Sequence, residues 1–205
     1  MKSLSLFIKP ASSLCNMKCR YCFYSNVSDN RAIKSYGIMR EDVMNVIIDK
    51  AITELDEEGI LNIAFQGGEP LVAGFEYFKS FCDYFRSKNT KRISVHYSVQ
   101  TNGTLITEQL GELFSKERFL VGVSLDGNKT YNDKYRKDSS GNGTYDSVIS
   151  GIEILNKYGV DFNVLGVITS SISGHAEELF DFLKSKRIYY FQPIPCLPDL
   201  ESKGD

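Results

Sequence analysis

A chain of 205 residues with 42% hydrophobic side chains is long enough to bury one sizeable core. Its 24 Lys and Arg nearly balance 26 Asp and Glu, and a formal charge of -2 argues against nucleic acid or an anionic membrane as a partner. The first ten residues lack the apolar run of a signal peptide, and no segment is apolar enough to span a bilayer. We therefore expect a cytoplasmic protein.

Apolar stretches predict six short strands that are separated by helical patterns. The first strand, at residues 4–9, leads into a loop at 10–22 that contains Pro, Ser and Cys. Apolar residues at steps of three and four then predict a helix over Arg40–Glu58. The remaining strands are predicted at 61–65, 93–99, 119–125, 162–168 and 189–194, with helical stripes between them at 75–85, 110–114, 148–155 and 179–183.

The regular alternation of strands and helices determines the fold class that we expect. A strand that is followed by a helix and another strand pairs in parallel through a right-handed crossover. Six such units can curl into an open barrel or form a doubly wound sheet. We predict an α/β fold, a partial (β/α)6 TIM-like open barrel, with residues 1–205 forming a single domain.

Polar segments follow the first four predicted strands. In parallel α/β folds, the loops after the carboxyl ends of the strands carry the chemistry. These segments should therefore meet at one edge of the sheet. They are 15–22, 66–70, 100–102 and 124–127.

Three of the five cysteines, Cys15, Cys19 and Cys22, lie within eight residues. The odd number of cysteines and the lack of an export signal argue against disulfides. The spacing C-x3-C-x2-C places three thiolates in one loop, where they can bind three irons of a cubane cluster and leave one iron open to another ligand. A structural zinc site is the alternative, and it requires a fourth Cys or His nearby. We predict no ligand role for the isolated residues Cys82, Cys196, His96 and His175.

The motif C-x3-C-x-Y-C, with Tyr21 before the third cysteine, resembles the cluster motif of the radical S-adenosylmethionine (SAM) superfamily. The resemblance implies an oxidoreductase with a [4Fe–4S] cluster on these three cysteines and SAM as its second cofactor. In that superfamily the amino and carboxylate groups of SAM chelate the open iron. Reductive cleavage of SAM then gives a 5′-deoxyadenosyl radical, which abstracts a hydrogen atom.

Further motifs resemble the SAM contacts of the superfamily. Gly67-Gly68-Glu69-Pro70 resembles its GGE motif, Ser124 in VSLDG matches a ribose contact, and Arg136 in KYRKD matches a contact to the SAM carboxylate. Considered singly, these residues also fit a tight turn, a capping serine and a solvated arginine. The cofactor-binding residues that the resemblance implies are Tyr21, Gly67, Gly68, Glu69, Asn102, Ser124, Arg136 and Leu197, the last beside the adenine.

Longer stretches are similar to the anaerobic sulfatase-maturating enzymes, among them IKPASSLCNMKCRYCFY, AFQGGEP, QTNGTLI and FLVGVSLDG. This resemblance implies oxidation of a Cys or Ser side chain of a sulfatase to formylglycine, with an electron donor such as ferredoxin or flavodoxin. It places Tyr24 and Gln66 as catalytic residues that face the peptide substrate, although an aromatic residue and an amide in these positions also fit simple packing and capping.

The resemblance also implies a longer protein. Members of this family continue into a C-terminal domain that binds two auxiliary clusters, which 205 residues do not contain. We expect the chain to be the N-terminal radical SAM domain of such a protein. Two alternatives stay open: a maturase of another peptide, and an incomplete SAM- and cluster-binding module that needs a partner.

Overall fold

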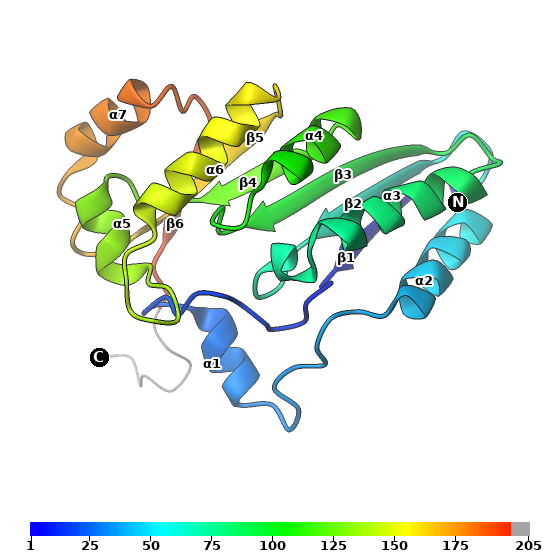
Figure 1. The fold of residues 1–205 in the computed structure, drawn as a ribbon, viewed down its shortest axis with the longest axis horizontal. Coiled ribbons are helices and arrows are strands. Elements are labelled where there is room, and N and C mark those ends of the chain that lie inside the picture. The colour runs from blue at the N-terminus through cyan, green and yellow to red at the C-terminus, as the bar shows by residue number, and fades with distance from the viewer. Residues whose placement is uncertain (198–205) are drawn as a thin grey trace.

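Six strands form one parallel sheet with the spatial order β1-β2-β3-β4-β5-β6 (Figure 1). The computed structural model describes residues 1–197, so residues 198–205 of the predicted domain lie outside the described part. The sheet is open between β1 and β6, which confirms the predicted α/β fold and an open barrel in place of a closed one. The strands are β1 (Ser3–Ile8), β2 (Ile60–Phe65), β3 (Ser94–Thr101), β4 (Leu120–Ser124), β5 (Phe162–Ile168) and β6 (Phe191–Pro195).

The five predicted helical stripes all form helices. They are α2 (Glu41–Glu54), α3 (Phe75–Lys88), α4 (Glu108–Lys116), α6 (Tyr145–Lys157) and α7 (Ala176–Ser185). The prediction for α2 ran too far, because the backbone becomes extended at Leu55 and Glu58 has a positive φ of 57°. No helix within residues 1–197 is long and apolar enough to cross a membrane.

Three short helical elements escaped prediction because they carry no apolar stripe. They are α1 (Phe23–Asp29), the 3-10 helix η1 (Pro70–Ala73) and α5 (Lys129–Tyr135). Local capping starts two of them: the Glu69 carboxylate accepts from the Leu71 amide, and the Asn128 side chain accepts from the Tyr131 amide. Both caps lie in the loops that follow β2 and β4, so they shape the carboxyl edge of the sheet.

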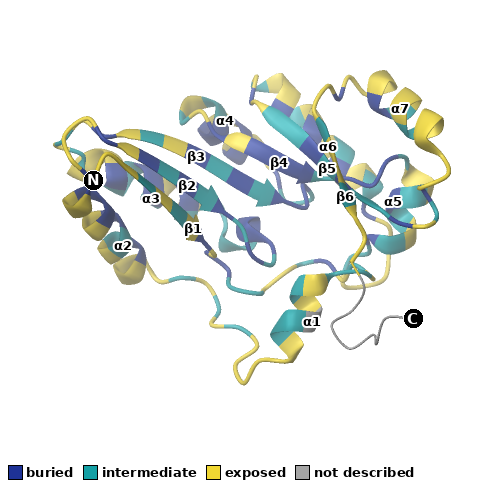
Figure 2. Cartoon of the chain, turned by 180° about the vertical axis from the view of Figure 1, so that it is seen from behind, coloured by how far each residue is buried: buried dark blue, intermediate teal, exposed yellow. Residues whose placement is uncertain are grey.

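The helices cover one face of the sheet and leave the other uncovered. Figure 1 shows α2, α3, α4 and α6 in front of the strands, and Figure 2, seen from behind, shows the strands without a helix over them. Side chains alternate accordingly: Tyr97 and Val99 of β3 are buried, whereas His96 is exposed and Ser98 half-buried on the other side. The predicted period of two in β3 is therefore confirmed.

An aromatic cluster fills the space between the sheet and the helices. The ring of Phe65 from β2 packs edge-on against Phe78 and Phe81 of α3, with centroids 5.1 Å apart in both pairs. Tyr97 stacks on Phe119 at 4.8 Å. Burying each such ring stabilises the fold by about 1.5–3 kcal/mol, so the core provides a firm base for the loops at the carboxyl edge.

Candidate active site

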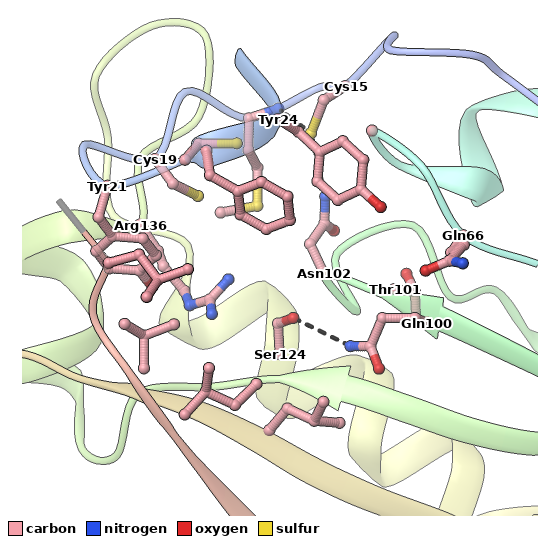
Figure 3. A pocket seen from close by; sticks show the side chains of 18 of the residues that line it. Cys15, Cys19, Tyr21, Tyr24, Gln66, Gln100, Thr101, Asn102, Ser124 and Arg136 are labelled. Atoms are coloured by element: carbon pink, nitrogen blue, oxygen red, sulfur yellow. Dashed lines mark hydrogen bonds between the residues drawn. The ribbon is translucent and has the colours of Figure 1, made fainter. Parts of the chain in front are cut away.

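The four polar segments meet at the carboxyl edge of the sheet, around a cavity of about 260 Å³ (Figure 3). Its walls come from loops that are far apart in the chain, as expected for a parallel α/β fold. All predicted site residues except Glu69 line it. They are Cys15, Cys19, Tyr21, Cys22, Tyr24, Gln66, Gly67, Gly68, Asn102, Ser124, Arg136 and Leu197. The structure brings these residues together, and their individual roles stay predictions.

The three clustered cysteines lie in the irregular segment between β1 and α1 and face the cavity. Burial raises the pKa of Cys19 to about 11, although the nearby Arg136 guanidinium lowers it in part. The pKa of Cys15 is also raised, mainly by burial. Both thiols therefore stay protonated at neutral pH until a metal displaces the proton.

The three thiols share one cavity but are not arranged as a ready-made site for a single metal ion. Within residues 1–197, no three His, Cys, Asp or Glu side chains converge on one point as the ligands of a single metal ion do. A cubane cluster does not require such convergence, because each thiolate binds a different iron.

The glycine pair after β2 allows the backbone of this loop to pack directly against the cysteine segment. A Cβ atom on Gly68 would lie 2.3 Å from the carbonyl oxygen of Leu14, and one on Gly67, where φ is +128°, would lie 2.7 Å from that of Ser12. The Gly68 amide donates to the Ser12 carbonyl at 3.1 Å, and the Glu69 amide donates to that of Leu14 at 2.8 Å. These positions need glycine because two backbones touch there, in addition to any contact with a cofactor.

Glu69 is the predicted cofactor-binding residue that the structure places apart from the cavity. Its carboxylate is 1% exposed and accepts hydrogen bonds from Thr101 Oγ1 at 2.8 Å and from the amides of Leu71 and Asn102 at 2.9 and 2.6 Å. Burial raises its pKa to about 7, against the lowering effect of these donors. The carboxylate therefore ties the loop after β2 to the end of β3.

Asn102 continues this connection to the cysteine segment. Its Nδ2 donates to Asn16 Oδ1 at 2.9 Å and approaches Cys15 Sγ at 3.9 Å. Its Oδ1 accepts from the amide and the hydroxyl of Thr104 at 3.0 and 2.8 Å. Both polar atoms of the side chain thus have partners in the protein, and these bonds orient the segment that carries Cys15.

Asp126 organises the opposite side of the cavity, and sequence reasoning did not assign it a role. The residue is 3% exposed. Its Oδ1 lies 3.1 Å from Arg136 Nη2 and accepts from the Val167 amide at 2.9 Å, while its Oδ2 accepts from the Tyr21 hydroxyl. The sequence did offer a clue to this residue, because Asp126 lies in the polar segment that follows β4. One carboxylate thus joins the cysteine segment, α5 and β5.

Arg136 presents a buried positive charge to the cavity. The residue is 6% exposed, and its guanidinium points into the cavity beside the Tyr21 ring, 5.5 Å from the ring centroid (Figure 3). Its Nε atom has no hydrogen-bond partner in the described protein. A buried donor without a partner is costly, so this atom fits a site that an anionic ligand completes.

The remaining predicted residues lie around the cavity mouth and wall. In Figure 3 the Tyr24 hydroxyl and the Gln66 amide point toward the interior. Ser124 Oγ accepts from Gln100 Nε2 at 3.3 Å, and Gln100, which belongs to the predicted polar segment 100–102 but was assigned no role, also lines the cavity. Leu197 is 64% exposed at the end of the described chain. The cavity is therefore lined by thiols, one guanidinium, several side-chain amides and apolar side chains.

Comparisons with known proteins identify relatives of this chain. A cysteine-type anaerobic sulfatase-maturating enzyme from Clostridium novyi is 43% identical over 96% of this chain and 52% of its own length. Another from Clostridium perfringens is 45% identical over the whole of this chain and 55% of its own length. The chain thus spans about half the length of these curated relatives.

A solved structure has the same fold. It is anSMEcpe with bound AdoMet (SAM) and a Kp18Cys peptide, with a TM-score of 0.90 and 42% identity over 99% of this chain and 54% of that one. Residues 10–183 match the family model of the radical SAM superfamily, whose members use a [4Fe–4S] cluster and SAM. Because this match covers most of the sequence, the chain belongs to the radical SAM superfamily.

Proposed function

We propose that the chain binds a [4Fe–4S] cluster and SAM, cleaves SAM reductively and removes hydrogen from a side chain of a protein or peptide. The observation that carries this proposal is the meeting of three thiols and one incompletely bonded buried guanidinium in a single cavity. Two known cofactor chemistries, a thiolate-bound cluster and a carboxylate ligand, match these two features. We further propose that residues 1–205 act as one domain, located in the cytoplasm.

The protein's own residues bind and orient the two cofactors. Cys15, Cys19 and Cys22 hold the cluster, while Arg136 binds the SAM carboxylate and Ser124 a ribose hydroxyl. The remaining proposed SAM contacts are Tyr21, Gly67, Gly68, Asn102 and Leu197, and Glu69 acts by holding the loop that carries the glycines. When bound, the cluster would supply the electron that cleaves SAM to a 5′-deoxyadenosyl radical.

The substrate that we propose is a cysteine of a sulfatase, which is oxidised to formylglycine. Identities of 43–45% with cysteine-type relatives, against 28–33% with serine-type ones, favour Cys over Ser. Tyr24 and Gln66 contact the peptide in this proposal, since both point into the cavity. Ferredoxin or flavodoxin is the proposed class of electron donor, with no nucleic acid or membrane partner.

Deuterium transfer tests the proposal. The reconstituted chain is mixed under anaerobic conditions with SAM, dithionite and a sulfatase-type peptide whose cysteine carries deuterium at Cβ. We expect deuterium in the 5′-deoxyadenosine, detected by mass spectrometry, and a matched peptide with deuterated alanine in place of cysteine should give none. Gln66→Ala should lower label transfer more than total SAM cleavage, because Gln66 is proposed to contact only the peptide.

The same experiment separates the alternatives. SAM cleavage without deuterium transfer from this peptide would favour an incomplete module that needs a partner, or a maturase of another peptide. Absence of SAM cleavage would contradict the proposed function itself.

A further inference from the structure

The cysteine segment forms one half of a two-stranded ribbon. Residues 17–20 run antiparallel to residues 135–138, and the amides of Lys18 and Arg20 donate to the carbonyls of Lys137 and Tyr135 at 2.8 and 3.0 Å. In Figure 1 the blue cysteine segment accordingly lies beside the yellow-green loop that follows α5. Segments more than 110 residues apart in the sequence are thus joined at the back of the cavity.

The two faces of this ribbon differ in kind. Met17, Cys19 and Arg136 line the cavity, whereas their sequence neighbours Lys18 and Arg20 do not and are exposed. Successive side chains of an extended segment point to opposite sides, which explains the alternation. Only the thickness of one backbone therefore separates Cys19 from the outer surface.

The outer face carries more positive than negative charge. We define the basic ribbon as Lys18, Arg20 and Lys137, together with the exposed Lys134 in the last turn of α5, which leads into the second strand of the ribbon. None of the four forms an ion pair within residues 1–197. This concentration of basic residues is notable on a chain whose formal charge is -2.

Two acidic residues adjoin the basic ribbon, and both are turned to backbone amides. Asp133 accepts from the amides of Thr144 and Tyr145 at 2.9 and 2.8 Å, at the start of α6. Asp138 accepts from the amides of Ser140 and Asn142, both at 2.8 Å. Neither carboxylate forms an ion pair with a cation of the ribbon in the part of the chain that the structure describes, so the four cations outnumber the two acidic residues at this surface.

We propose that the basic ribbon is the docking surface for an acidic, low-potential one-electron carrier protein. This inference rests on the proposed function, because SAM cleavage consumes one electron that the chain must receive from outside. In the docked complex the carrier loses one electron and is oxidised, and the chain is reduced by that electron through the segment of Cys19. No bond between the two proteins forms or breaks.

Electrostatics favour this surface as the site of encounter. Opposite charges steer two proteins together and can raise the association rate by about 10- to 1000-fold at low salt. Redox complexes are typically weak and small, so a ribbon with four cations can provide much of the interface. The Debye length falls to about 8 Å at physiological ionic strength, so the attraction should weaken as salt is added.

Charge reversal on the basic ribbon tests the proposal. The variant K18E/R20E/K134E changes three exposed side chains and leaves the main-chain hydrogen bonds of the ribbon in place. The matched control K50E/K116E/K186E makes the same change of charge in α2, at the end of α4 and after α7. Iron content and circular dichroism establish that both variants fold and hold the cluster.

Two measurements are made with flavodoxin as the probe. The first is 5′-deoxyadenosine formation driven by reduced flavodoxin or, separately, by dithionite, which needs no docking surface. We expect the ribbon variant to lose at least about tenfold with flavodoxin at low salt, and to stay within about twofold of the unmodified chain with dithionite. The second is the Kd for oxidised flavodoxin, which should rise at least about tenfold for the ribbon variant and little for the control.

The outcomes keep this proposal distinct from the proposed function. Equal losses in the ribbon and control variants, or an unchanged Kd in the ribbon variant, would overturn the docking surface. Failure of dithionite to cleave SAM with the unmodified chain would instead contradict the proposed function, and the Kd measurement would still decide the docking proposal.

Discussion

Two buried carboxylates hold the cysteine segment from opposite sides, and they do so by different means. Glu69 forms no ion pair within residues 1–197 and accepts only from neutral donors, namely Thr101 and two backbone amides. Asp126 is paired with the buried Arg136 and also accepts from Tyr21 and a backbone amide. Glu69 therefore fixes a backbone, whereas Asp126 fixes the position of a charge.

The difference matters because the two sides of the cavity have different tasks. On the Glu69 side, the glycine pair and Asn102 bring backbone and amide groups against the cysteine segment. On the Asp126 side, a cation must stay in the cavity although the surroundings desolvate it. A neighbouring carboxylate stabilises that cation, and it raises the pKa of Arg136 despite the opposing effect of burial.

The largest effect, a loss of stability, should follow removal of the negative charge of Asp126. Asp126→Asn leaves the Arg136 guanidinium buried without a counter-charge, and removal of one partner of a buried pair costs about 3–5 kcal/mol. We expect the free energy of unfolding to fall by this amount in urea denaturation. The double variant D126N/R136M should recover much of the loss, because the uncompensated charge is gone. A double variant as unstable as the sum of both single changes would contradict the pairing.

The next effect concerns SAM binding on the same side. Arg136→Met should weaken SAM binding about 10- to 100-fold, because a charge-assisted hydrogen bond contributes about 1.5–3 kcal/mol. Equilibrium dialysis of the reconstituted chain with labelled SAM measures this directly. Arg86→Met, which changes an exposed arginine paired with Glu117, is the control and should leave the affinity unchanged. An equal effect of both changes would remove Arg136 from the SAM site.

A smaller loss is expected on the Glu69 side. Glu69→Gln replaces an acceptor with an amide that faces the Asn102 amide hydrogen, and a buried group left without its hydrogen bond costs about 1–3 kcal/mol. Urea denaturation should show this loss. Hydrogen exchange at the Asn102 amide should also become faster, because that amide loses its acceptor. No change in either measurement would mean that Glu69 does not hold this loop.

The pH dependence of stability should change gradually, and it provides the most specific signature of Glu69. The pKa of Glu69 is raised from an ordinary value of 4.5 to about 7, so the folded state binds more protons than the unfolded state between these values. The free energy of unfolding should therefore fall as pH rises from 4.5 to 7, by at most about 1.4 kcal/mol per pH unit for one proton. Glu69→Gln should lack this component, and an identical slope in both proteins would contradict it.

Much of the fold and the composition of the cavity could be predicted from sequence, because both depend on local patterns. Period-two and period-3.6 spacing located the six strands and five longer helices, and the rule that loops after parallel strands share one edge brought Cys15, Gln66 and Ser124 to the same cavity. Short polar helices such as α5 escaped because their sequences carry no apolar stripe.

What sequence could not provide is the partner of each polar group. Asp126 and Glu69 follow strands in the same way, yet one meets a guanidinium and the other meets only neutral donors. The requirement for glycine at position 68 likewise depends on the carbonyl of Leu14, which lies more than 50 residues away in the chain. Such contacts are set by tertiary packing and leave no mark on either residue's neighbours in sequence.

Iron content and SAM cleavage after anaerobic reconstitution test the central claim most directly. The unmodified chain and Cys82→Ala, which removes a core thiol and keeps the three predicted ligands, should both hold about four irons and form 5′-deoxyadenosine with SAM and dithionite. Cys19→Ala should lose both. Retention of a full cluster and of cleavage by Cys19→Ala, or absence of both from the unmodified chain, would contradict the account.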